Sequence, residues 1–401
     1  MRKNLLVLLI AQALSTGAIT VSVSLSSIVV DDITGNAALS GLPSTINFFA
    51  SAIAAYWFGR LMAARGRRIG LALGCIIGGV GALLAAWMAL QHNFVGFLIG
   101  GTLVGICNGA MSQNRYAAGE MVSKAVRGRV MGSLLTGSVL GTVFSYAITP
   151  LFYNMARDLQ LPAIEFGWYL GGAYLILAAL LIWALLRPDP KALAVTEDGL
   201  GLTSDQVSSV PIRPWPLLLR NPGIRLAMIS LMFAQGLMVM LMVLTPLHAK
   251  HLGVEPTLLV TEHIVGMFGF AWLTGQLVDA WGRRTVVMLG AAQMIIAGFV
   301  AVFATRSLEL GFSMFMVGLG WNFLNVAGST LLTDHLEPRE RARVQGGAEL
   351  TVWLSAASGA LGGGLVVGAY GFPMIGVLAM ALACIPLVMA FFSKTERISG
   401  K

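Results

Sequence analysis

Three ionisable side chains lie inside long apolar stretches of this chain: Glu349, Glu262 and His263. Burying a charge in hydrocarbon is costly, so ionisable residues in such stretches are candidates for function by default. A carboxylate can carry a proton, and histidine titrates nearest to neutral pH. The sequence therefore predicts that Glu349, His263 and Glu262 take part in proton coupling.

Each of these residues also has a structural interpretation, and the sequence leaves both open. Glu349 could be tied to Arg343 or to a neighbouring helix end. His263 could be satisfied by a neighbouring backbone group or by Glu262. Glu262 could lie close enough to the outer surface to stay solvated.

Neutral amides form the second group of candidates. They can donate and accept hydrogen bonds without the cost of burying a charge, which suits them to binding a substrate inside a membrane. The predicted substrate-binding residues are Gln12, Asn47, Asn108, Gln235, Asn322 and Asn325. Hydrogen bonding between helices is the competing role for such amides.

The composition places these residues in transmembrane helices. The chain has 401 residues, of which 57% are hydrophobic and only 11% charged, and this excludes a water-soluble protein. Apolar stretches of about 20 residues match the length of helix that crosses a bilayer. We expect spans near 5–30, 40–60, 69–90, 94–114, 128–151, 166–186, 224–247, 256–278, 285–304, 309–332, 344–368 and 372–392.

The positive charges predict the orientation of these spans. With the N-terminus inside, all 26 Lys and Arg residues except Arg157, Lys250 and Arg306 fall in cytoplasmic segments. Both termini are therefore predicted to be cytoplasmic. The net charge of +8 is explained by contact with anionic membrane lipids, so nucleic acid is not an expected partner.

No metal site or cofactor is expected. Cys75, Cys107 and Cys384 are far apart and have no histidine at a metal-ligand spacing, so we interpret them as small buried apolar residues. The chain also lacks the glycine-rich phosphate-binding motif of ATP-driven proteins.

A polar segment and an internal repeat divide the chain into two halves. Residues 187–221 are too hydrophilic to enter lipid and predict a cytoplasmic linker between bundles at 1–186 and 222–401. Gly59 to Arg68 resembles Gly275 to Arg284, 216 positions later. Glu120, Arg127 and Arg129 are matched by Asp334, Arg341 and Arg343, 214 positions on. Such repeats are typical of secondary transporters.

The sequence G-x-x-x-D-x-x-G-R-R at 275–284 resembles the loop motif of the major facilitator superfamily. The resemblance covers nearly the whole chain and implies an all-α membrane fold of twelve helices in two pseudo-symmetric six-helix bundles. It implies gating residues that latch helix ends together: Asp279, Arg283, Arg284, Arg67, Arg68, Arg127, Arg129, Glu120, Asp334 and Arg341. Topological anchoring by the arginines is the alternative, and Ala63 replaces the motif acid in the first half.

The function expected from this resemblance is transport by alternating access, not enzymatic catalysis. We predict proton-coupled export of a small organic molecule, such as a drug or metabolite, by a monomer in a bacterial inner membrane. A proton-coupled importer of a neutral metabolite is the first alternative, and a membrane sensor that does not transport is the second.

Overall fold

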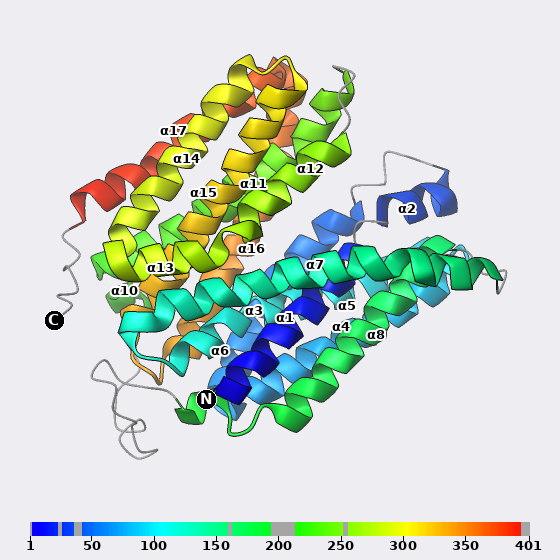
Figure 1. The fold of residues 1–401 in the computed structure, drawn as a ribbon, viewed down its shortest axis with the longest axis horizontal. Coiled ribbons are helices and arrows are strands. Elements are labelled where there is room, and N and C mark those ends of the chain that lie inside the picture. The colour runs from blue at the N-terminus through cyan, green and yellow to red at the C-terminus, as the bar shows by residue number, and fades with distance from the viewer. Residues whose placement is uncertain are drawn as a thin grey trace. The chain divides into compact units, whose positions relative to one another are not determined.

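The described part of the chain, residues 2–22, 26–35, 42–158, 163–193, 213–251 and 256–393 of a computed structural model, is built from helices (Figure 1). Part of the predicted linker, residues 194–212, lies outside these ranges. Within them, helices occupy all twelve predicted spans.

The membrane-length segments follow the sequence prediction with shifted ends. They are α1 (Arg2–Ser22), α3 (Leu42–Arg65), α4 (Arg67–Leu90), α5 (Phe94–Met111) with α6 (Asn114–Glu120), α7 (Arg127–Asp158), α8 (Ala163–Leu185), α11 (Pro222–His251), α12 (Pro256–Ile264) with α13 (Ala271–Trp281), α14 (Arg283–Phe303), α15 (Ser307–Asp334), α16 (Arg341–Tyr370) and α17 (Phe372–Phe392). Two short helices, α2 (Ser26–Thr34) and α10 (Trp215–Leu218), complete the set of α-helices among the described residues. Among the described residues, eight helical stretches are long and apolar enough to span a membrane, one of them being α5 together with α6.

Contacts divide the chain into two compact units. Unit 1 comprises Met1–Met121, Gly137–Ala194 and Ala342–Leu350, and unit 2 comprises Val122–Thr136, Val195–Arg341 and Thr351–Lys401. The halves predicted from sequence correspond to most of each unit. The difference is that the first turns of α7 pack within unit 2 and those of α16 within unit 1.

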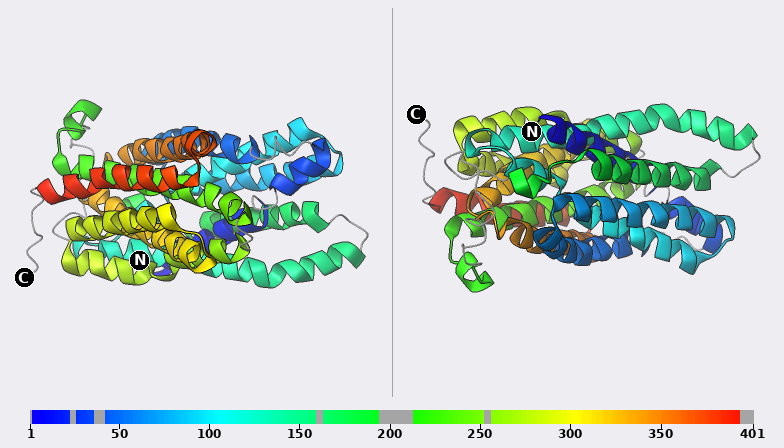
Figure 2. Two further views of the ribbon diagram at one scale, coloured as in Figure 1. Left: turned by 90° about the horizontal axis from the view of Figure 1, so that it is seen from above. Right: turned by 90° about the horizontal axis from the view of Figure 1, so that it is seen from below.

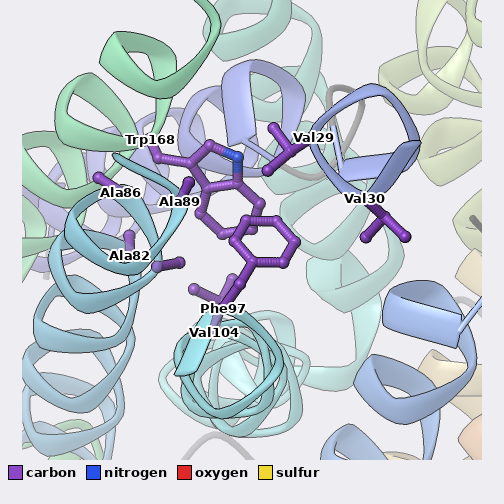
Figure 3. Packing of buried hydrophobic residues seen from close by; sticks show 9 residues of the cluster. Val29, Val30, Ala82, Ala86, Ala89, Phe97, Val104 and Trp168 are labelled. Carbon is purple, nitrogen blue, oxygen red and sulfur yellow. The ribbon is translucent and has the colours of Figure 1, made fainter. Parts of the chain in front are cut away.

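Unit 1 has an aromatic core between α4, α5 and α8, and α4 packs against both neighbours. The indole ring of Trp168 meets the ring of Phe97 edge to face, with centroids 5.1 Å apart (Figure 3). The side of α4 that packs beside this pair carries only small side chains at Ala82, Ala86 and Ala89. Small side chains on α4 let the bulky rings fill the space between helices, which suits the close packing of membrane helices.

In unit 2, α14 packs against α15 and α17, and α11 packs against α15. The α14 and α17 helices run side by side in Figure 1, and Figure 2 shows the pair from above. A π-helical turn at Val265–Gly269 separates α12 from α13, so the predicted span 256–278 is interrupted. Cys75 and Cys107 are buried, but Cys384 is exposed on α17, so the prediction that it is buried was wrong. Many side chains of α17 are exposed on the protein surface, and a small apolar side chain such as Cys384 can contact membrane lipid there.

Pairs of glycines let the first turns of α7 and α16 pack closely against neighbouring helices. In unit 2, a Cβ added to Gly132 of α7 would lie 3.1 Å from the Cα of Gly275 in α13. In unit 1, a Cβ on Gly59 of α3 would lie 2.7 Å from the Cα of Gly346 in α16. The Cβ on Gly132 would also lie 2.3 Å from the carbonyl oxygen of Ala271, and real Cβ atoms essentially never come within 3.0 Å of another atom, so both crossings need glycine. These four glycines occupy equivalent positions of the internal repeat.

We expect Gly275→Leu to lower the free energy of unfolding by about 1–3 kcal/mol, the usual cost of overpacking. The matched control is Gly364→Leu, because a Cβ at Gly364 meets no atom within 4 Å. Thermal unfolding of both purified variants in detergent checks this. Equal melting temperatures for the two variants would contradict the requirement for glycine at the α7–α13 crossing.

Candidate functional site

Glu349 forms a buried ion pair in unit 1. Its carboxylate on α16 contacts the guanidinium of Arg115 on α6 and accepts a hydrogen bond of 3.0 Å from the hydroxyl of Tyr116. The side chain of Glu349 is 1% exposed and that of Arg115 is 12% exposed. The guanidinium also lies over the Tyr116 ring, 4.9 Å from its centroid. The carboxylate is thus paired with a cation that retains some access to its surroundings.

A second buried cluster in unit 1 centres on Arg67, at the start of α4. Its Nε donates to Glu120 over 3.2 Å and its Nη1 donates to the Gln113 side chain over 3.1 Å. The other guanidinium nitrogen contacts both Glu120 and Gln345. Gln345 belongs to the first turns of α16, so Arg67 ties α4 and the end of α6 to that helix start.

The corresponding cluster in unit 2 joins one acid to two arginines. Asp334 at the end of α15 contacts Arg127 of α7, and its second oxygen accepts a hydrogen bond of 2.8 Å from Arg283 of α14. The side chains of all three residues are at most 5% exposed. Arg283 also donates to the carbonyl of Lys124 over 2.6 Å. Asp334 therefore contacts two buried cations from different helices.

Asp279 of α13 binds the N-terminus of α7. Its two oxygens accept hydrogen bonds from the backbone amides of Gly128 (3.0 Å) and Arg129 (2.8 Å), and Arg283 lies 3.5 Å away. The free amides at a helix start favour a negative charge. A proton on this carboxyl would weaken its hold on the two amides.

In the first half of the chain, the loop motif at residues 59–68 lacks its acid, and an acid from outside the motif binds the helix start. Ala63 stands at the position of the acid, and its carbonyl accepts a hydrogen bond from Lys191. Asp189 instead accepts from the backbone amides of Arg67 (3.1 Å) and Arg68 (2.9 Å). Gly66 and Gly282 turn the chain with φ of 95° and 85°, a conformation that favours glycine. The acid in unit 1 therefore holds the start of α4, not the start of α16.

The remaining predicted gating arginines make contacts within their own units. Arg68 lies over the ring of Trp183 at 4.4 Å, and Arg284 donates to the carbonyl of Phe391. Arg341 is buried and donates to the carbonyl of Leu336 over 3.0 Å. For Arg129, the backbone amide makes the contact with Asp279.

His263 and Asn47, which occupy equivalent repeat positions, each join two helices of their own unit. His263 is fully buried, and its Nδ1 donates to the carbonyl of Met314 on α15 over 3.1 Å. Asn47 accepts a hydrogen bond of 3.0 Å from Asn108 on α5. Glu262 lies against Gly311 of α15. These contacts favour the structural interpretation for His263 and Asn47.

The other amides also make hydrogen bonds within their units. Gln12 donates to Ser138 over 3.2 Å and accepts from Asn114 over 3.0 Å. In unit 2, Gln235 accepts from the Trp321 indole over 2.8 Å, and Asn322 donates to the carbonyl of Met267 over 2.6 Å. Asn325 pairs within α15, with Ser329 at 3.4 Å. Gln12 and Asn108 are the partly exposed members, so a role in substrate binding stays a prediction for them above all.

No group of three or more metal-ligating side chains occurs within the described ranges. The model of the Major Facilitator Superfamily matches residues 8–278 and 255–401 of the chain.

The chain belongs to the major facilitator superfamily. It therefore has the twelve-helix fold of this family, is a multi-pass membrane protein and is a transporter, not an enzyme. The prediction from the loop motif is confirmed.

Several transporters of this superfamily resemble the chain over most of its length. An uncharacterized MFS-type transporter, YddS of Bacillus subtilis, is 28% identical, with 98% of this chain and 92% of the relative covered. The riboflavin transporter RfnT of Brucella anthropi is 24% identical (97% and 96%), and the multi-drug resistance efflux pump PmrA of Streptococcus pneumoniae is 25% identical (86% and 84%). The solved proton:xylose symporter XylE superposes with a TM-score of 0.80 at 15% identity (97% and 94%), a likeness of fold alone.

Two residues of this superfamily member were missed by sequence reasoning. Arg115 was counted only as a cytoplasmic charge, because the fourth span was ended at residue 114, whereas the candidate span runs from Phe94 to Glu120. Asp189 was treated as part of the linker. For Arg115 the sequence offered no usable signal, since the nearby Glu120 pairs with Arg67. For Asp189 the sequence gives none either.

Proposed function

We propose that this transporter couples proton movement to the export of small organic molecules across a bacterial inner membrane, with Glu349 as the proton carrier. The observation that carries the proposal is the buried Glu349–Arg115 pair on α16 and α6. A buried carboxylate and guanidinium stabilise each other, and either alone is costly in such a site. Proton binding and ion pairing at Glu349 are therefore mutually exclusive.

This exclusion gives a physical means of coupling. A proton on Glu349 cancels its charge and releases the guanidinium of Arg115, which then needs another partner or water. Loss of the proton restores the pair. In the paired state, Tyr116 also donates a hydrogen bond to the carboxylate. Proton uptake at Glu349 thus changes which contacts α6 and α16 make with each other.

The clusters around Arg67, Asp279 and Asp334 are proposed to act as latches. Each holds the start of α7 or α16 within a unit through charged or charge-assisted contacts. Such contacts are strong when made and can be exchanged for water when broken. Their release during the transport cycle is the proposed gating step, with the arginines at the helix ends as its cations.

The resemblance to the efflux pump PmrA favours export. Because a riboflavin transporter is also among the relatives, the compounds tested should not be limited to drugs. Proton-coupled import of a neutral metabolite is the alternative that the same pair at Glu349 would serve. The sign of proton movement separates the two directions.

The test is reconstitution in liposomes containing a pH-sensitive dye, with a panel of drugs, riboflavin and sugars as substrates. Wild type is expected to show substrate-dependent proton flux, and Glu349→Gln is expected to lose it by about 100-fold or more, as for loss of an essential proton-transfer group. The matched control is Glu309→Gln, since Glu309 is exposed and caps α15 through the amides of Thr305 and Arg306. Full proton flux in Glu349→Gln would contradict the assignment.

A further inference from the structure

Unit 2 contains a cavity of about 500 Å³ between α11, α16 and α17 that the proton-coupling and latch residues do not use. Its walls include Met232 and Met240 from α11, Ser358 and Gly362 from α16, and Leu378 from α17. The volume lies within the range of about 300–1,000 Å³ that is usual for sites of drug-sized ligands. All lining residues are uncharged.

The cavity opens beside a tight helix crossing. At the crossing, a Cβ on Gly359 would lie 3.1 Å from the carbonyl carbon of Gly236, and the hydroxyl of Ser355 lies 2.8 Å from the carbonyl oxygen of Met232. Gly362 follows three residues later on the same face of α16, about 4.5 Å along the helix axis. A Cβ at Gly362 meets no atom within 4 Å. This glycine is not needed for packing, and its missing side chain leaves the space open.

We propose that this cavity binds an uncharged, lipophilic organic molecule of drug size, and that such molecules are a substrate class of the transporter. A charged group would have no partner here, since no lining side chain carries a charge. The hydroxyl of Ser358 can offer a hydrogen bond to a polar atom of the ligand, while the two methionines adapt to varied shapes. The part about substrates depends on the transport function proposed above, but the binding itself does not.

Photolabelling tests the binding without any gradient. The protein, reconstituted in lipid nanodiscs, is irradiated with a neutral benzyl-diazirine probe, and adducts are located by mass spectrometry. We expect adducts on cavity residues such as Met232, Met240 and Leu378. An excess of a neutral aromatic competitor should remove them, whereas a quaternary ammonium analogue of similar size should not.

Filling the cavity supplies the decisive variants. Gly362→Leu is expected to reduce competitor-sensitive labelling by about tenfold or more, equivalent to 1.4 kcal/mol or more of binding free energy. Ser358→Leu is a second filling variant from the same helix. Gly364→Leu is the matched control, because it adds the same side chain in open space without lining the cavity, and it should label as wild type does.

Three results would overturn the proposal: labelling that no competitor removes, which indicates a groove filled by lipid; equal competition by the charged analogue; or undiminished labelling in both filling variants. If labelling behaves as expected but the liposomes show no flux with any compound, the binding site stands and the transport proposal fails. If flux of the neutral competitor persists unchanged in Gly362→Leu, the compound is transported by another route and its role as a substrate of this cavity is refuted.

Discussion

Asp334→Asn is expected to lower the free energy of unfolding by about 3–5 kcal/mol, the typical cost of removing one partner from a buried ion pair. Asparagine keeps the shape of the side chain but not its charge. Arg127 and Arg283, both nearly inaccessible, would then lie next to each other without an anion between them. Arg283 would keep Asp279 at 3.5 Å, and the two arginines would keep the backbone carbonyls of Val122 and Lys124, but these contacts only partly compensate two buried charges.

Thermal unfolding in detergent measures this loss, and Asp279→Asn is the matched control. The side-chain oxygen of an asparagine at 279 can still accept from the Gly128 or Arg129 amide, so this variant should lose much less. A melting temperature for Asp334→Asn at or above that of Asp279→Asn would mean that the two arginines do not depend on Asp334.

Arg115→Met is expected to cost a similar amount, about 3–5 kcal/mol, because it leaves the Glu349 carboxylate buried with only the Tyr116 hydroxyl as a partner. Methionine retains the apolar length of the arginine side chain. Adding Glu349→Gln should recover most of the loss, since neither group is then charged. Buried ion pairs replaced by neutral groups of similar volume are often as stable as the original pair.

The full set of single and double variants measures the coupling between the two residues. Stability recovered in the double variant, together with no proton flux, identifies a pair that is dispensable for folding and essential for transport. A double variant as unstable as Arg115→Met would show that the arginine stabilises the fold through contacts other than Glu349, and wild-type flux in that double variant would exclude proton coupling at this pair.

Much of the architecture was predictable because hydrophobic stretches and repeated motifs are local signals. The twelve-helix fold and the family follow from these patterns. The pairing partners were not predictable in the same way. Glu349 was weighed against Arg343, its neighbour in sequence, whereas its partner Arg115 is 234 positions away.

The same limit applies to Arg67 and Gln345, which are 278 positions apart. A single sequence indicates which face of a helix is buried but not which distant helix covers it.

The amides show a different limit of prediction from sequence. Gln235 and Asn322 were expected at a substrate site, and both are occupied by hydrogen bonds inside unit 2. Residue type predicts that a partner exists in an apolar interior, but not whether that partner is a ligand or the protein.

The sharing of helix starts between units has a consequence for biogenesis. Unit 2 needs residues 122–136, which have already been synthesised when its own helices emerge from the ribosome. Unit 1 needs residues 342–350, which are the last of its own residues to emerge and follow most of unit 2. Until then, the face of α3 at Gly59 and the guanidinium of Arg67 lack the helix that covers them. The half of the protein that is inserted first is therefore completed only after most of the second half has been synthesised.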